Sequence, residues 1–154
     1  MGIAQIREAT VADVPAIVRA WRLGGGEAGG PDPRIERYLV GEHHPQQALP
    51  ERAMFVAEHG GALVGYIAGH LTRRFGCDGE LQWIFVALRH RGSGVSADLL
   101  RRLVEWFREH DAARVCVDVD PANLIARRFY ARHGAGELNK HWMVWDDIGS
   151  SMRV

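Results

Sequence analysis

The spacing of hydrophobic positions divides the first third of the chain into a short strand followed by two helices. Residues 3–7 alternate apolar and polar side chains, which predicts a strand with one buried face. Apolar residues at helical spacing then follow Thr10, which is placed as an N-cap, and Gly24 is expected to end this helix. Residues 24–31 are rich in glycine and predict a flexible connection. A second, short helix is predicted over residues 33–40.

The rest of the chain alternates predicted strands and helices. Strands are predicted over residues 52–58, 63–72, 80–86, 114–119 and 142–145, with a shorter one near Glu137. Gly60 and Gly61 predict a tight hairpin turn. Helices are predicted over 94–110 and 124–133, and the first should face the sheet through Val95, Leu99, Leu103 and Phe107. A strand–helix–strand crossover should make the strands 80–86 and 114–119 parallel neighbours. The pattern indicates an α/β domain (α+β in the stricter classification) with a mixed sheet.

The segment that joins the strand ending at Val86 to the following helix is typical of an anion-binding loop. Gly92 and Gly94 allow a sharp turn and a close approach of the backbone to a ligand. The N–H groups at the start of the helix favour an anion, and Arg89 and Arg91 add positive charge. The loop therefore predicts a pyrophosphate site.

Two familiar glycine-rich loops fit this segment poorly. A Walker loop requires Gly-x-x-x-x-Gly-Lys-Ser/Thr, which the chain lacks. Residues 92–97 do fit the dinucleotide fingerprint Gly-x-Gly-x-x-Ala. However, residues 88–91 separate the first glycine from its strand, and only 60 residues follow Gly94. A nicotinamide-dependent oxidoreductase is therefore a distant alternative.

A third known type of glycine-rich loop fits residues 89–94 better. Arg89-x-x-Gly92-x-Gly94 resembles the loop that holds coenzyme A in the GNAT superfamily of N-acetyltransferases, and residues 123–134 resemble that family's Asn-x-x-Ala-x-x-Phe-Tyr-x-x-x-Gly helix. Many members carry proline at Leu88 and glycine at Ser96. The resemblance implies a mostly antiparallel sheet of six to seven strands, flanked by about four helices. Its parallel central pair would splay apart around coenzyme A.

The resemblance also implies which residues hold acetyl-CoA, through main-chain groups of the loop and of the strand before it. The expected cofactor-binding residues are Phe85, Val86, Arg89, Arg91, Gly92, Ser93, Gly94, Val95, Ser96 and Asn123. Asn123 would contact the pantetheine arm, cap its own helix, or do both. Tyr130 occupies the family's tyrosine position and is the expected general acid toward the departing thiolate. The alternative is that Tyr130 only packs its helix against the sheet.

Glu80 is the expected general base, because the histone-acetylating branch of the family uses a carboxylate at this strand position. It precedes Val86 by six residues, so regular alternation predicts that both side chains share one face of the sheet. Gln82 would share that face and could position an amine. The alternative for Glu80 is a solvated carboxylate at a strand end.

Composition narrows the class of protein further. The chain has 154 residues, which predicts a single domain over 1–154, and its 19 basic and 19 acidic residues balance. This balance argues against nucleic acid or a membrane surface as partner. Two cysteines are too few for a disulfide framework, and no Cys/His spacing predicts a metal site. Cytoplasmic residence is expected, and a homodimer is a further assembly to consider.

These observations predict an N-acetyltransferase that moves the acetyl group from acetyl-CoA to a primary amine by direct attack in a ternary complex. The acceptor would be a small-molecule amine or a peptide amine, bound by the first two helices and residues 24–31, with Trp21 and Trp83 beside the cleft. The alternative is a non-catalytic acyl-CoA sensor that keeps the loop but needs no acid or base.

Overall fold

A computed structural model describes residues 4–23 and 35–151. The predicted connection over 24–31, the predicted start of the second helix and the side chain of Trp21 lie outside the described part. The strands are β1 (Gln5–Glu8), β2 (Ala48–His59), β3 (Ala62–Thr72), β4 (Gly79–Val86), β5 (Val115–Asp118), β6 (Gly136–Asn139) and β7 (Trp142–Trp145). The helices are α1 (Val14–Leu23), α2 (Ile35–Leu39), α3 (Val95–Glu109), α4 (Leu124–Arg132) and α5 (Ile148–Ser151). Short 3-10 turns are η1 (Val11–Asp13), η2 (Arg74–Gly76) and η3 (Leu88–His90).

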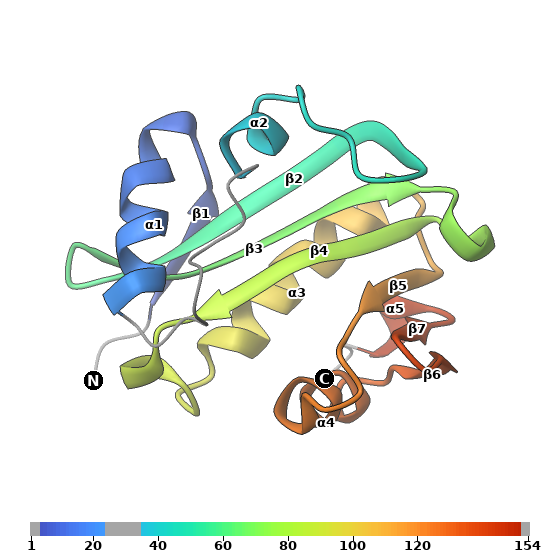
Figure 1. Ribbon diagram of the computed structural model, residues 1–154. Helices are drawn as coiled ribbons and strands as arrows, with labels where there is room; N and C mark the ends of the chain where they lie inside the picture. Colours follow the sequence, from blue (N-terminus) through green and yellow to red (C-terminus); the bar gives the residue numbers. More distant parts are fainter. Residues whose placement is uncertain (1–3, 24–34, 152–154) are drawn as a thin grey trace.

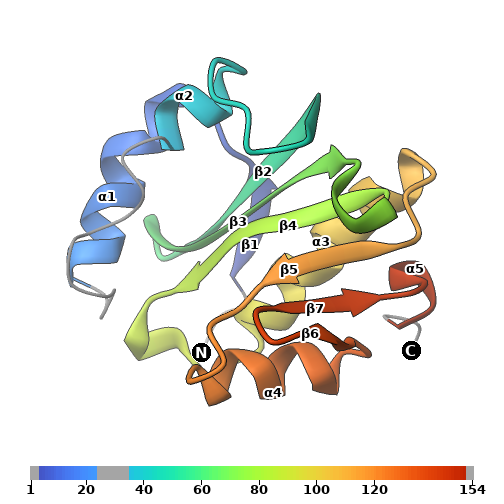
Figure 2. The same ribbon diagram turned by 45° about the vertical axis from the view of Figure 1, so that its right-hand side comes forward.

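All seven described strands belong to one sheet, in the order β1-β2-β3-β4-β5-β7-β6 (Figure 1). Every neighbouring pair is antiparallel except β4 and β5, which are parallel. Helices α1 and α2 cover one face of the sheet and α3 covers the other (Figure 2). The mixed sheet and its single parallel pair are therefore confirmed.

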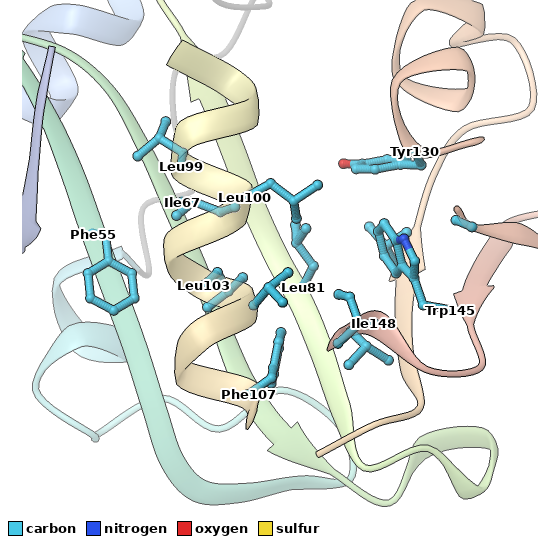
Figure 3. Close-up of a cluster of buried hydrophobic side chains, with 14 of the residues drawn as sticks. Phe55, Ile67, Leu81, Leu99, Leu100, Leu103, Phe107, Tyr130, Trp145 and Ile148 are labelled. Atoms are coloured by element: carbon cyan, nitrogen blue, oxygen red, sulfur yellow. The ribbon is translucent and has the colours of Figure 1, made fainter. Parts of the chain in front are cut away.

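Helix α3 forms the main core with the strands beneath it (Figure 3). Its buried residues include all four predicted sheet-facing positions, Val95, Leu99, Leu103 and Phe107. A side chain at Gly65 of β3 would place its Cβ 2.8 Å from the backbone oxygen of Phe85. The absence of a side chain there lets α3 and β4 approach β3 closely.

Gly65→Ala should lower the free energy of unfolding by about 1–3 kcal/mol, because the added methyl group meets backbone that cannot move aside. Denaturant titration measures this change. Gly136→Ala is the matched control, since a Cβ at Gly136 would have no atom within 4 Å. We expect the control to stay within about 0.5 kcal/mol of the wild type. Equal stability of the two variants would contradict the prediction.

Strands β4 and β5 pair only at their beginnings and then separate. Gly79, Glu80 and Leu81 face Val115, Cys116 and Val117 in register, and β4 continues to Val86 beside β3 alone. Figure 1 shows the two strands diverging toward their carboxyl ends. The predicted splayed pair is confirmed, and the splay leaves the β5-facing edge of β4 without a strand partner.

Strand β4 contains a bulge that changes which face each side chain takes. Ala68 of β3 pairs with Trp83, but the next residue, Gly69, pairs with Leu81, so Gln82 is the extra residue. Leu81 and Val86 therefore both belong to the α3-side core, and Trp83 belongs to the opposite one.

The bulge corrects the predicted position of Glu80. Glu80 pairs with His70, whose ring bonds to Tyr38 of α2, so its side chain lies on the α2 side of the sheet. The expectation that Glu80 and Val86 share a face is wrong, because the extra residue between them reverses the alternation.

Other differences from the predicted elements are small. Strand β2 begins earlier than expected, at Ala48, and α5 after Trp145 was not expected. The predicted cap at Thr10 is present, where its N–H donates to the carboxylate of Asp13 at 2.7 Å. Within residues 4–23 and 35–151, the helices lack the combination of length and apolar composition that a membrane crossing requires.

Candidate active site

The loop between β4 and α3 has the backbone conformation that its glycines predict. Gly92 and Gly94 both lie in the left-handed region, with φ of 78° and 94°. A Cβ at either position would meet no atom within 4 Å. The glycines are therefore required by conformation, and the space in front of them is open to a ligand.

Several N–H groups of this loop lack an acceptor within the described part of the chain. The N–H groups of Arg91 and Ser93 donate to carbonyls inside the loop, and Asp98 makes the first helical bond of α3, to Gly94. The amides of Gly92, Gly94, Val95 and Ser96 are among those without a bonded acceptor. No side chain caps the helix at Gly94. These donors, at the positive end of the α3 dipole, suit an anion.

The two predicted arginines of the loop differ in their surroundings. The Nε of Arg91 donates to the backbone oxygen of Val86 at 2.9 Å, and its guanidinium lies 5.9 Å from the ring centre of Phe85. Arg91 therefore fixes the loop to the end of β4. Arg89 is exposed on η3, at the entrance to the loop.

The end of β4 presents one of the two predicted backbone donors to the splay. The N–H of Ala87 donates to Val64 of β3 at 2.8 Å. Since alternate residues of a strand point the same way, the N–H of Phe85 also faces β3, and those of Ile84 and Val86 face the side of β5. Val86 therefore offers its amide to the cleft, while Phe85 contributes its side chain to the core with α1 and α2.

A cavity of about 420 Å³ opens where β5 ends and α4 begins. It is lined by Asp118, Val119, Asp120, Asn123, Ala126, Tyr130 and His141. The Oδ1 of Asn123 accepts the N–H of Ala126 at 3.1 Å. Asn123 therefore caps α4, which is one of the two roles predicted for it. Its side-chain NH₂ remains a donor on the cavity wall.

Tyr130 lies between α4 and the sheet, with 5% of its surface exposed. Its ring contacts Trp145 edge-on at 5.7 Å, and its hydroxyl points across toward α3 (Figure 3). Burial, and to a lesser degree the charge of Asp118, raise the pKa of Tyr130 above its ordinary value. The phenol therefore stays protonated at neutral pH and can donate a hydrogen bond.

Glu80 is buried in a polar cluster that the sequence did not predict. Its Oε1 accepts the Nε of Arg74 at 3.0 Å and lies 3.6 Å from the Nε2 of His70. The other ring nitrogen of His70 lies 2.9 Å from the hydroxyl of Tyr38. Tyr38 joins this cluster through His70 from a distant part of the sequence, and Arg74 comes from the η2 turn before β4, so no periodic pattern could have identified them. The alternative of a solvated carboxylate is wrong, since Glu80 is only 4% exposed.

Asp118 lies between the two predicted catalytic residues. Partial burial, followed by the charge of Glu80, raises the pKa of Asp118, although His141 and Arg74 act in the opposite direction. Asp118 and Tyr130 line the same cavity, and the charge of Asp118 also raises the pKa of Tyr130.

The described residues hold no group of three or more His, Cys, Asp or Glu side chains suited to a metal ion. Cys77 and Cys116 are both buried free thiols. Burial is the main cause that raises the pKa of Cys116. The site thus consists of backbone donors, carboxylates and a phenol.

Comparison with known proteins identifies relatives for this arrangement. The model of the acetyltransferase (GNAT) family matches residues 19–135. An uncharacterised N-acetyltransferase of Mycobacterium bovis is 34% identical over 85 residues, which cover 55% of this chain and 53% of that protein. The chain thus spans about half the length of the curated relatives that it matches first. The aminoglycoside N(6')-acetyltransferase type 1 of Serratia marcescens is 29% identical over 100 residues, covering 60% of this chain and 68% of that one.

A solved structure agrees with the same fold. The PaiA N-acetyltransferase of Thermoplasma acidophilum, in complex with coenzyme A, superposes with a TM-score of 0.69 and 14% identity. The superposition covers 94% of this chain and 99% of that one. At this identity the similarity concerns the fold alone.

Proposed function

Because the chain belongs to the acetyltransferase (GNAT) family, we propose that it transfers the acetyl group from acetyl-CoA to a primary amine. The neutral amine attacks the thioester directly while both substrates are bound. The observation that carries this proposal is the row of unbonded amides at Gly92, Gly94, Val95 and Ser96, at the open end of the splayed strand pair.

These amides fit the diphosphate of coenzyme A. Those of Gly94, Val95 and Ser96 are consecutive donors at the N-terminus of α3, and the glycines leave the space in front open. Arg89 lies beside them as a positive charge. The amide group of Asn123 is available to the pantetheine arm from the α4 side of the splay, and the N–H of Val86 faces the cleft from β4.

Acetyl transfer also requires stabilisation of the thioester oxygen as negative charge develops. A backbone N–H fixed in place before the reaction is well suited to this, because it needs no reorganisation. The amide of Val86 faces the cleft at the end of β4 and takes this role. The bulge at Gln82 lies in β4 just after the last residue that pairs with β5, where β4 and β5 separate.

Two side chains carry the proton transfers. An alkylammonium has a pKa of about 10, so the acceptor must lose a proton before it attacks. Glu80 accepts that proton, directly or through a water molecule. Tyr130 donates its hydroxyl proton, or a hydrogen bond, to the thiolate of coenzyme A as it leaves. Its raised pKa keeps the phenol in the protonated form that this role needs.

The acceptor class follows from the chemistry of the site. A small-molecule amine fits the cavity beside Asp118, and the name of the Serratia marcescens relative supports this class. A peptide amine is the second candidate. Other features remain predictions from the sequence: the protein binds no nucleic acid, membrane or metal, it resides in the cytoplasm, and it forms a homodimer.

Gly92→Val is expected to weaken binding of coenzyme A at least tenfold. A β-branched side chain is strained at φ of 78°, and it would project into the space in front of the amides. Titration calorimetry with coenzyme A measures this directly. Gly61→Val is the matched control, because Gly61 has φ of 81° and equally open surroundings in the β2–β3 hairpin. An unchanged dissociation constant for Gly92→Val would place coenzyme A elsewhere.

Turnover separates the enzyme from a non-catalytic acyl-CoA sensor. Thiol release from acetyl-CoA is followed with a panel of primary amines. Amine-dependent release supports the transferase. Tight binding of acetyl-CoA with no amine-dependent release would support the sensor instead.

A further inference from the structure

We propose that Arg74 determines acceptor specificity by occupying the cation position of the acceptor site. The ammonium group of the acceptor displaces the Arg74 guanidinium from Glu80, so uncharged molecules are rejected at this step. The inference rests on the proposed function, because it assumes that the face carrying Glu80 receives the acceptor.

The side chain of Arg74 is held as a bound cation would be. Its Nε donates to Glu80 at 3.0 Å, and its guanidinium carbon lies 4.8 Å from the ring centre of Trp142. A carboxylate on one side and an aromatic face on the other form a common recognition site for organic cations. An alkylammonium group can make both contacts.

This position is continuous with the acceptor side of the cleft. Trp142 pairs in register with Asp118, which lines the cavity. Glu80 and Trp83 lie on the same face, where Trp83 contacts Tyr38 edge-on at 4.9 Å. The Arg74 position therefore adjoins the cavity wall through the Asp118–Trp142 strand pair, and in this proposal the ammonium group passes from there to Glu80.

Exchange of one cation for another keeps the charge balance of the site. Glu80 is 4% exposed, and a buried carboxylate without a counter-ion is strongly destabilising. An incoming ammonium supplies the same single charge as the guanidinium that leaves. A neutral molecule does not, so its entry would leave Glu80 unpaired. The same exchange puts the acceptor nitrogen next to the proposed base.

Two left-handed residues lie close to Arg74, one next to it in the chain and one in the segment that its turn contacts. Phe75, the next residue, has φ of 55°, and Gln47 has φ of 64°, both in the left-handed region. The N–H of Arg73 donates to Gln47 at 3.1 Å, and the guanidinium of Arg74 donates to Gln46 at 3.0 Å. Left-handed non-glycine residues store conformational energy and cluster at sites that change shape. Release of the Arg74 contacts would let the η2 turn relax.

Binding of phenethylammonium chloride tests the proposal, with neutral 2-phenylethanol as the comparison ligand. Calorimetry is run on the whole chain with and without saturating coenzyme A. Arg74→Gln removes the internal cation and should tighten phenethylammonium binding about tenfold, since the carboxylate and the Trp142 face are then free to hold the ligand's ammonium group. Arg74→Lys keeps the charge and should remain within about threefold of the wild type. Arg73→Gln, at the neighbouring exposed arginine, is the matched control.

Three results would overturn the proposal. The first is equal or weaker binding of phenethylammonium to Arg74→Gln, including no saturable binding, which would make Arg74 a structural ion pair. The second is an equal gain for 2-phenylethanol, which would indicate newly opened space. The third is a gain in the Arg73→Gln control. Failure of the proposed function would show separately, as absence of coenzyme A binding, while the amine titration of the free protein still reports on Arg74.

Discussion

Replacing Glu80 with glutamine should lower kcat for amine acetylation by about 10²–10⁴-fold, the usual contribution of a positioned general base. The amide has nearly the same shape but cannot accept the proton of the ammonium group. At neutral pH most of the acceptor is protonated, since its pKa is about 10. The loss should therefore shrink as the pH rises toward that value, because the uncharged glutamine needs no counter-ion and so admits an amine that arrives already neutral. Initial rates measured across this pH range test both statements.

Two controls isolate the chemistry of Glu80. The Gln variant also loses the ion pair with Arg74, so its dissociation constant for coenzyme A and its unfolding midpoint are measured beside the rates. Glu137→Gln, at a carboxylate whose side chain is 66% exposed, should leave the rates unchanged. A pH–rate profile for Glu80→Gln that matches the wild type would assign the base to another group.

Tyr130→Phe should reduce kcat about 10²-fold while the dissociation constant of coenzyme A changes little. The ring keeps its edge contact with Trp145, so the variant removes the hydroxyl and preserves the packing. Without that donor, the thiolate leaves with no proton and no hydrogen bond. Pre-steady-state rates of thiol release separate this step from release of the product.

The pH dependence gives a second check on Tyr130. Because burial raises its pKa, ionisation of this phenol should cause no loss of rate below about pH 10. If the rate of the wild type declined well below that pH, and the decline were absent in Tyr130→Phe, the buried and protonated phenol would be contradicted. A kcat unchanged by the substitution would limit Tyr130 to packing.

The spacing of apolar residues predicted most of the helices and strands, because that spacing indicates which side chains are buried. The four residues of α3 at i, i+4 spacing are buried, as their spacing required. The Gly60–Gly61 turn and the close packing at Gly65 follow from what glycine alone permits. Such features depend on a few neighbouring residues, so the sequence contains them directly.

The candidate site was less predictable, because its decisive features depend on tertiary structure. The bulge at Gln82 is set by how β4 pairs with β3, and simple alternation placed Glu80 on the wrong face. The contacts of Glu80 with His70 and Arg74 join residues that no periodic pattern connects. The free amides after Gly92, in contrast, follow from glycines and a helix start that the sequence displays.

The extra residue at Gln82 could be lost without turning its neighbours over. Leu81 is anchored beneath α3, and Trp83 is anchored on the other face. Adjacent residues of a regular strand also point to opposite faces, so deletion of Gln82 would leave both anchors in place and make the pairing of β4 with β3 regular. The acidic side chain before Leu81 would stay on its side of the sheet. Its orientation is thus tied to the packing of its apolar neighbours, and a descendant that lacks the bulge would still carry the carboxylate on the same face.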